Sequence, residues 1–198
     1  IVISLVGSEM CIRDREYLYK GTDGIKNLQN KVTESPVSCP DDKISKEMEN
    51  EIKLARKKKD TLGGSITTIA TGVPPTLGSF VHWDRKLDAN MARIFMSIQS
   101  VKAVEIGNGI EVSKNYGTEV QDQYFLDQEN IKKESNNLGG FEGGMTNGED
   151  IVVKAYLKPI STTLTPIKSI NLSTKNETET VYEPVSYTHL RAHETDHD

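Results

Sequence analysis

The clearest periodic pattern in the chain is a run of apolar residues at helical spacing within residues 40–62. Four of them fall at steps of four, four and three positions and so share one helical face: Ile44, Met48, Ile52 and Ala55. Asp41 or Asp42 can cap the start of such a helix, and Gly63-Gly64 can end it. The pattern therefore predicts an amphipathic helix over most of this stretch.

Three consecutive lysines, Lys57–Lys59, stand in the last turn of this predicted helix. Cations there oppose the negative end of the helix dipole, which favours a solvated helix end. A cluster of ammonium groups also attracts anions, so a phosphate-binding patch is the alternative interpretation. The solvated helix end is the favoured one of the two.

Four stretches have the composition of strands, rich in β-branched residues and bounded by turn residues: 65–73, 103–112, 151–157 and 167–172. The second of these is broken at Gly107 and Gly109. The segment that follows it, residues 113–137, is rich in Asn, Asp, Gln and Glu. We expect this polar segment to be an exposed excursion between ordered regions.

A second amphipathic helix is predicted after the first strand, with Asp84 as its possible cap. Its apolar face would consist of four residues: Leu87, Met91, Ile94 and Phe95. Helices and strands follow one another along the chain without a regular β-α-β alternation. This order favours an α+β fold over a doubly wound parallel sheet.

Composition narrows the class of protein further. The chain has 198 residues, of which 35% are hydrophobic and 27% charged, enough for one to one and a half domains. No apolar stretch approaches the length of a membrane span, and the net charge of −5 argues against a nucleic-acid partner. Two cysteines, Cys11 and Cys39, are too few for a disulfide framework, so a cytoplasmic location is expected.

The strongest local candidate for chemistry is the glycine-rich segment 139–162. It contains five glycines within ten residues, then the strand 151–157, then Lys158-Pro159 and the hydroxyls of Ser161, Thr162 and Thr163. Glycines allow close approach of the backbone to a ligand, and a lysine with hydroxyls suits a phosphate or a polarised ring system. A flexible loop that joins a strand is the equal alternative. The spacing matches neither the P-loop nor GxGxxG.

A second candidate lies in the last ten residues, which hold three of the four histidines of the chain. His193, Glu194 and His197 fit HExxH, and His189 stands one helical turn earlier. On a helix these histidines could bind zinc, with Glu194 as general base. A zinc-binding or zinc hydrolase module is therefore the alternative function, although three histidines on one terminal helix enclose no cavity.

Three stretches of the chain, in matching order and spacing, resemble chorismate synthases. They are SPVSCPD (35–41), LGGSITTIATGVPPTLGSFVHWDRKLDANMARIFMSIQSVKAVEIGNG (62–109) and NNLGGFEGGMTNGEDIVVKAYLKPISTTLTPIKSINL (136–172). The resemblance covers about residues 16–183. It implies an α+β fold, an antiparallel β-sandwich with surrounding helices that is incomplete in this chain, and a homotetramer in the full-length enzyme.

The resemblance also implies a reaction, the conversion of 5-enolpyruvylshikimate 3-phosphate to chorismate in the shikimate pathway of aromatic amino acid biosynthesis. This step is a 1,4-elimination of phosphate and a proton by a carbon–oxygen lyase. It requires reduced FMN, which in the family view passes an electron transiently to the substrate and recovers it. The hard chemistry then belongs to the cofactor, and the protein supplies position and field.

Carried over by position, the flavin contacts of the family fall on eight residues: Gln99, Ser100, Gly143, Lys158, Pro159, Ile160, Ser161 and Thr162. The family motifs that bring the catalytic histidines and the substrate-binding arginines have no counterpart here. His82 matches a different motif, so no catalytic residue and no metal ligand is expected in this chain. The chain as written is therefore predicted to be inactive.

The two ends resemble translated sequencing adapters, in SLVGSEMCIRDR (4–15) and VSYTHLRAHET (185–195). The expected organisation is a non-native flank at 1–15, a partial chorismate synthase domain at 16–183 and a second flank at 184–198. In that organisation the HExxH match would come from a translated adapter sequence.

Overall fold

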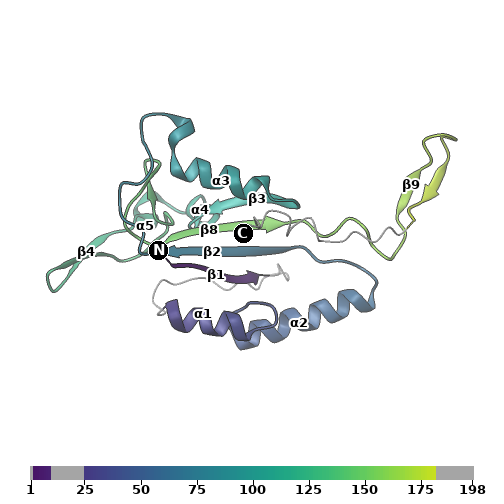
Figure 1. Cartoon of the computed structure of the whole chain (residues 1–198), viewed down its shortest axis with the longest axis horizontal. Coiled ribbons are helices and arrows are strands. Elements are labelled where there is room, and N and C mark those ends of the chain that lie inside the picture. Colours follow the sequence, from purple (N-terminus) through teal and green to yellow (C-terminus); the bar gives the residue numbers. More distant parts are fainter. Residues whose placement is uncertain (1, 10–24, 182–198) are drawn as a thin grey trace, which may run out of the picture.

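The centre of the protein is one antiparallel four-stranded sheet. A computed structural model describes residues 2–9 and 25–181 (Figure 1). The sheet has the strand order β1-β2-β8-β3, and the strands are β1 (Val2–Glu9), β2 (Gly64–Thr71), β8 (Ile151–Leu157) and β3 (Val101–Ile106). Every neighbouring pair is antiparallel, and β8 lies in the middle between β2 and β3.

The remaining elements surround this sheet. The helices are α1 (Ile25–Glu34), α2 (Asp42–Lys57), the 3-10 turn η1 (Trp83–Arg85), α3 (Leu87–Ser97), α4 (Gly109–Val112) and α5 (Gly117–Val120). Three two-stranded sheets are formed by β4 (Tyr124–Asp127) with β5 (Asn130–Lys133), β6 (Phe141–Glu142) with β7 (Met145–Thr146), and β9 (Lys168–Ile170) with β10 (Glu177–Glu179). Mixed helices and antiparallel sheets confirm the predicted α+β class.

Helix α2 confirms the first sequence prediction in its position and its cap. The Oδ1 atom of Asp41 accepts hydrogen bonds from the backbone N–H groups of Lys43 and Ile44, both at 2.9 Å. Two residues of the predicted apolar face, Met48 and Ala55, are buried. The helix satisfies its first N–H groups locally and has one apolar face, so the local signals were sufficient to predict it.

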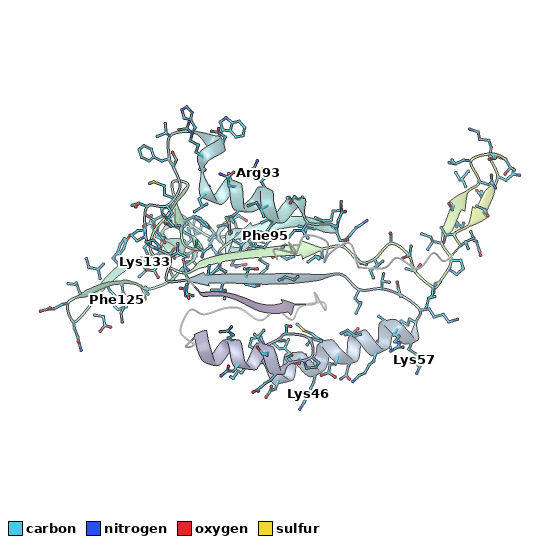
Figure 2. The ribbon with its side chains drawn as sticks, in the orientation of Figure 1. Lys46, Lys57, Arg93, Phe95, Phe125 and Lys133 are labelled. Carbon is cyan, nitrogen blue, oxygen red and sulfur yellow. The ribbon has the colours of Figure 1, made fainter. Side chains whose placement is uncertain are left out.

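Helix α3 packs on one face of the sheet. Its residues Leu87, Met91 and Phe95 contact a buried cluster that includes Ile151 and Val153 of β8. Figure 2 shows Phe95 on the sheet side of α3 and Arg93 on its outer side. The prediction that Ile94 belongs to the buried face was wrong, because this side chain is 55% exposed.

The start of α3 also differs from the prediction that Asp84 caps it. The N-cap residue is Lys86, which makes no side-chain cap bond. The backbone N–H of Leu87 instead donates to the carbonyl of Gly144 at 2.8 Å. A distant glycine-rich turn therefore satisfies this helix end, and Asp84 lies in η1.

The opposite face of the sheet is buried as well. Side chains alternate along strands, so Ser65, Thr67 and Ile69 of β2 face away from α3 together with Val152 and Lys154 of β8. Figure 1 shows α1 and α2 beside β1, on the opposite side of the molecule from α3, and α1 contacts β1. Strand β8 lies in the middle of the sheet and is buried on both faces, as its nearly continuous run of buried residues shows.

Between residues 103 and 137, one sequence prediction fails and another is confirmed in its exposure. The strand expected over 103–112 ends at Ile106, because residues 109–112 form α4, with the N–H of Ile110 donating to a carboxylate oxygen of Glu105 at 2.9 Å. The polar segment is exposed in large part but is also ordered, with α5 and the β4–β5 hairpin. Its anchor is Asp122, which is buried.

Several large apolar side chains point to solvent. The loop before α3 exposes Phe80, Val81 and Trp83, and Trp83, the one tryptophan of the chain, is 83% exposed. The β9–β10 hairpin projects away from the sheet (Figure 1). Within residues 2–9 and 25–181, no helix is both long and apolar enough to cross a membrane.

Candidate functional site

The eight residues predicted as flavin contacts divide between the two ends of strand β8. We call the Leu157 end, with residues 99–100 and 158–164, the lysine end, and the Ile151 end, with residues 139–150, the glycine end. Seven of the eight residues lie at the lysine end, and Gly143 lies at the glycine end. The seven residues of β8 separate the two ends by about 20 Å at the usual rise of a strand.

The lysine end brings together two segments that are far apart in the sequence. The backbone N–H of Lys158 donates to the carbonyl of Ser100 at 2.9 Å, directly after the pairing of Leu157 with Val101. Ser100 has a φ of 71°, so the chain turns sharply between α3 and β3 at this residue. Gln99-Ser100 and Lys158 are therefore neighbours, as a shared binding site requires.

The segment after β8 also rests on the residues that link α2 to β2. The Thr61 hydroxyl donates to the carbonyl of Ile160 at 2.7 Å. A side chain at Gly63 would begin 2.7 Å from the Leu157 carbonyl oxygen and 3.1 Å from Cδ of Pro159, so only glycine fits there. These contacts fix the path of residues 158–160 relative to the end of α2.

A pocket of about 340 Å³ lies between the end of α2 and this segment. Its walls are largely apolar, and the apolar lining residues are Ile52, Ala55, Leu62, Ile160 and Leu164. Polar groups come from Arg56, Lys59, Asp60, Thr61 and Thr162. The volume and the mixture of apolar walls with a few polar groups are typical of a small-molecule site.

Sequence reasoning missed the contribution of α2 to this pocket. The signal that could have found it was the basic run, for which a phosphate patch was the alternative to a solvated helix end. Lys57 and Lys58 are exposed and lie outside the pocket lining, whereas Lys59 belongs to it. The exposed Lys57 and Lys58 agree with the solvated helix end, whereas the phosphate patch stays a prediction for Lys59.

The glycine end is built from backbone packed on backbone. A Cβ atom on Gly139 would lie 2.3 Å from the backbone nitrogen of Gly107, and one on Gly107 would lie 2.3 Å from the Asn137 carbonyl oxygen. A Cβ atom on Gly140 would meet the Asp150 carbonyl oxygen at 2.7 Å. These glycines are required because the chain packs against itself, which is a structural role.

Gly143 differs from these neighbours. Nothing lies within 4 Å of the position that its Cβ atom would take, but its φ is +60°. The residue is exposed at the turn between β6 and β7. Glycine serves here for its backbone conformation, and its N–H and carbonyl stand at an open surface.

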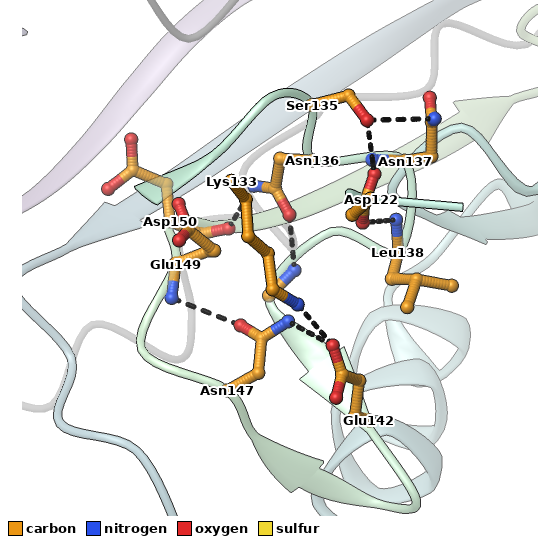
Figure 3. A network of polar contacts seen from close by, with 11 residues as sticks. Asp122, Lys133, Ser135, Asn136, Asn137, Leu138, Glu142, Asn147, Glu149 and Asp150 are labelled. Atoms are coloured by element: carbon orange, nitrogen blue, oxygen red, sulfur yellow. Dashed lines mark hydrogen bonds and ion pairs between the residues drawn. The ribbon is translucent and has the colours of Figure 1, made fainter. Parts of the chain in front are cut away.

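A polar network ties the glycine end together (Figure 3). The buried Asp122 carboxylate accepts hydrogen bonds from the Ser135 hydroxyl at 2.6 Å and from the backbone N–H groups of Asn137 and Leu138 at 2.7 and 3.1 Å. Asn136 donates to the Asp150 carbonyl at 2.7 Å and accepts from the Gly140 N–H at 2.9 Å. Each of these hydrogen bonds joins two positions of this chain, so the network has a structural role.

An ion pair between Lys133 and Glu142 joins the β4–β5 hairpin to this network. The Lys133 side chain is 3% exposed, and its Nζ atom lies 4.9 Å from the centre of the Tyr124 ring. Burial disfavours the charge on Lys133, but the hydrogen bonds to Glu142 and Tyr124 outweigh it and raise its pKa above the ordinary value. The hydrogen bond from Lys133 lowers the pKa of Glu142. Both groups are therefore held in their charged forms.

The zinc alternative cannot be placed in the structure, because His189, His193, Glu194 and His197 lie outside the described residues. Within the ranges 2–9 and 25–181, no group of three or more His, Cys, Asp or Glu side chains could hold a metal ion. His82 is exposed beside η1.

Comparison with known proteins gives one consistent result. The family profile described as chorismate synthase matches residues 4–187. The curated chorismate synthase of Caldicellulosiruptor saccharolyticus is 45% identical over 163 residues, which are 82% of this chain and 42% of that protein. The chorismate synthase of Shouchella clausii is 45% identical over 152 residues, 76% of this chain and 39% of that protein.

A solved structure described as a crystal structure of chorismate synthase has the same fold. It matches with a TM-score of 0.65 and 34% identity, over 81% of this chain and 50% of that chain. The chain thus spans less than half the length of these curated relatives and half the length of the solved one.

Proposed function

This chain belongs to the chorismate synthase family, and we propose that its lysine end is part of the site at which the complete enzyme binds reduced FMN. The family relation supports a lyase that acts on a small molecule. For the complete enzyme we propose the 1,4-elimination of phosphate from 5-enolpyruvylshikimate 3-phosphate to give chorismate. We also propose that this enzyme is a cytoplasmic homotetramer.

The observation that carries this proposal is the contact between Ser100 and Lys158. It joins the two longer segments that the resemblance assigns to the flavin, Gln99-Ser100 and Lys158–Thr162. Beside them lies the pocket, to which Ile160 and Thr162 contribute. The residues present therefore fit a flavin, because apolar walls suit a ring or a carbon chain and the basic and hydroxyl groups suit phosphate.

Three residues of the lysine end have simple tasks in this proposal. Ile160 provides an apolar surface, the Thr162 hydroxyl can donate or accept a hydrogen bond, and the exposed Lys158 ammonium attracts an anion. The rigid path of residues 158–160 keeps these groups in position and so reduces the entropy lost on binding. When bound, reduced FMN would lend an electron to the substrate, so the elimination needs no net oxidation.

The chain alone is proposed to be inactive, because the family motifs with the catalytic histidines and substrate-binding arginines are missing from its sequence. We expect no chorismate when the chain is incubated anaerobically with reduced FMN and 5-enolpyruvylshikimate 3-phosphate. Formation of chorismate above the rate of a protein-free blank would contradict this expectation.

Flavin binding is the direct test. Titration of FMN with the chain, followed by quenching of flavin fluorescence, should saturate. The double variant Lys158→Met with Thr162→Val should weaken binding about tenfold, because it removes one charge-assisted contact and one hydroxyl. Lys46→Met, an exposed change on α2 (Figure 2), is the matched control and should bind like the unchanged chain. Absence of any saturable binding would contradict the proposed function.

A further inference from the structure

The pocket at the lysine end has a cationic side that the resemblance does not assign to any function. Arg56 and Lys59 line it from the last turn of α2 and the residues directly after it. We propose that these two residues bind the phosphate group of the flavin, so that the flavin site extends onto α2. This inference rests on the proposed function, since the flavin is its ligand.

The first argument is the charge balance of the pocket. Arg56 and Lys59 are two cations, and Asp60 is the one anion among the lining residues. The Asp60 carboxylate already accepts a hydrogen bond from the backbone N–H of Thr61 at 2.8 Å. Neither Arg56 nor Lys59 takes part in an ion pair with another residue that the structure describes. Their donors are therefore available to an anion.

The second argument concerns the carbonyl groups at the end of α2. Free carbonyls at a helix C-terminus would repel an anion. Here they are occupied: the Ala55 carbonyl accepts from the Asp60 N–H at 3.0 Å, and the Arg56 carbonyl accepts from the Lys59 N–H at 3.1 Å. Thr165 donates from its N–H to the Lys59 carbonyl at 3.3 Å, and its hydroxyl lies 3.4 Å from the Lys58 carbonyl. These hydrogen bonds reduce the repulsion that the helix end would exert on an anion.

The third argument is the backbone of Lys59. The two bonds from Asp60 and Lys59 form the Schellman arrangement that commonly ends a helix, and its left-handed position is usually glycine. Lys59 holds this position with a φ of 58°. A side chain in this conformation is destabilising by about 1 kcal/mol. A strained residue that lines a pocket is a reason to look for a role in binding.

These arguments give an unusual expectation for Lys59→Gly. The change removes both the strain and the cation, so it should raise the Tm by about 3 °C while it weakens FMN binding about tenfold. Arg56→Gln should weaken FMN binding by a similar factor without raising the Tm. Because Lys59→Gly should lose affinity although it is stabilised, misfolding cannot explain its loss.

The experiment compares FMN with riboflavin, which lacks the phosphate, in four chains: the unchanged chain, Arg56→Gln, Lys59→Gly and Lys57→Gln. Lys57→Gln is the matched control, since it removes an exposed charge next to the pocket but outside its lining (Figure 2). We expect FMN to bind more tightly than riboflavin to the unchanged chain and the control, and this difference to disappear in the other two variants. Riboflavin affinity should be the same in all four chains.

Three other outcomes would overturn the inference. Equal binding of FMN and riboflavin to the unchanged chain would show that no phosphate is recognised. A preference for FMN that survives in both pocket variants would place the phosphate elsewhere. A preference that falls equally in Lys57→Gln would attribute it to the general field of the helix. Each of these results leaves the proposed flavin site intact, whereas absence of binding by both flavins removes the site and the inference together.

Discussion

At its Ile151 end, strand β8 is held by glycines whose backbones touch one another, whereas at its Leu157 end it leaves the sheet beside a pocket. At the glycine end the close contacts and hydrogen bonds lie within the chain: backbone N–H groups donate to Asp122, and Lys133 donates to Glu142. At the lysine end, a few hydrogen bonds fix the chain beside the pocket. The two ends belong to one continuous motif in the sequence, but the glycine end has a structural role and the lysine end is the candidate binding site.

The difference is instructive for reading glycine-rich segments. Close approach of the backbone is what makes glycine useful at a ligand, and it is equally what makes glycine useful where two parts of a chain cross. Gly107 and Gly139 serve the second purpose, since each occupies space that a side chain on the other would need. The capacity for a ligand lies instead where side chains with unpaired charges surround a cavity.

The largest expected effect tests the structural role of the glycine end. Gly139→Ala should lower the free energy of unfolding by about 3 kcal/mol, because it adds a backbone clash at 2.3 Å to the strain of a φ of +63°. Urea unfolding followed by circular dichroism measures the change.

Gly117→Ala is the matched control for this substitution. Nothing lies within 4 Å of a Cβ atom at Gly117, and the residue begins the short helix α5. Its effect should stay within about 0.5 kcal/mol. Similar effects of the two substitutions would remove the contrast between a packed glycine and an open one.

A smaller effect is expected at the lysine end. Thr61→Val keeps the shape of the side chain but removes the hydrogen bond to the Ile160 carbonyl, so it should destabilise the fold by about 1 kcal/mol. Because that bond holds the wall of the pocket, FMN affinity should fall as well. In Gly139→Ala, by contrast, FMN affinity measured under folding conditions should be unchanged. Loss of affinity in the glycine variant alone would reverse the assignment of the two ends.

The smallest effect concerns the Lys133–Glu142 pair. The folded-state pKa of Glu142 is lower than its ordinary value, so the pair stabilises the fold above about pH 5 and this contribution is lost as the pH falls through the lowered pKa. Its size should be about 0.5 kcal/mol, since 46% of the Glu142 side chain is exposed to solvent. Glu142→Gln should flatten the decline of stability between pH 6 and pH 3 by this amount, as followed by thermal melts.

The stabilisation by the Lys133–Glu142 pair also depends on pH in the alkaline range. The pKa of Lys133 is raised above its ordinary value of 10.5, so its contribution is present below that pH and is lost above it. Lys133→Met should remove both the acid and the alkaline pH dependence that the pair contributes to stability. If melts of the unchanged chain and of Glu142→Gln had the same acid dependence, the pair would have no energetic role at the glycine end.

Elements with local signals could be predicted from the sequence. Helix α2 carries its own cap in Asp41, and β8 is bounded by a glycine-rich turn and by Lys158-Pro159. The start of α3 could not be predicted, because the carbonyl that satisfies its first N–H belongs to Gly144, far along the chain. The sequence predicts residues 109–112 as part of a strand that is interrupted by glycines. In the structure, Gly107 directly follows the end of the strand and Gly109 begins a short helix.

The candidate site was predictable in part for the same reason. The segment Lys158–Thr162 stands out in the sequence, but its partners on α2 enter the pocket only because the chain returns to the end of that helix. The separation of Gly143 from this segment could have been foreseen, since a seven-residue strand lies between them. Gly143 and Lys158–Thr162 both stay predicted flavin contacts, at opposite ends of this strand.

Trp83 has a practical consequence for anyone who studies this chain in solution. It is the one tryptophan, and 83% of it is already in contact with water in the folded state. Unfolding will hardly change the surroundings of its indole ring, so the wavelength of its emission should stay nearly constant across a denaturation curve. The tryptophan fluorescence of the protein therefore reports on one surface loop, and it should respond to whatever covers that loop but hardly to the loss of the core.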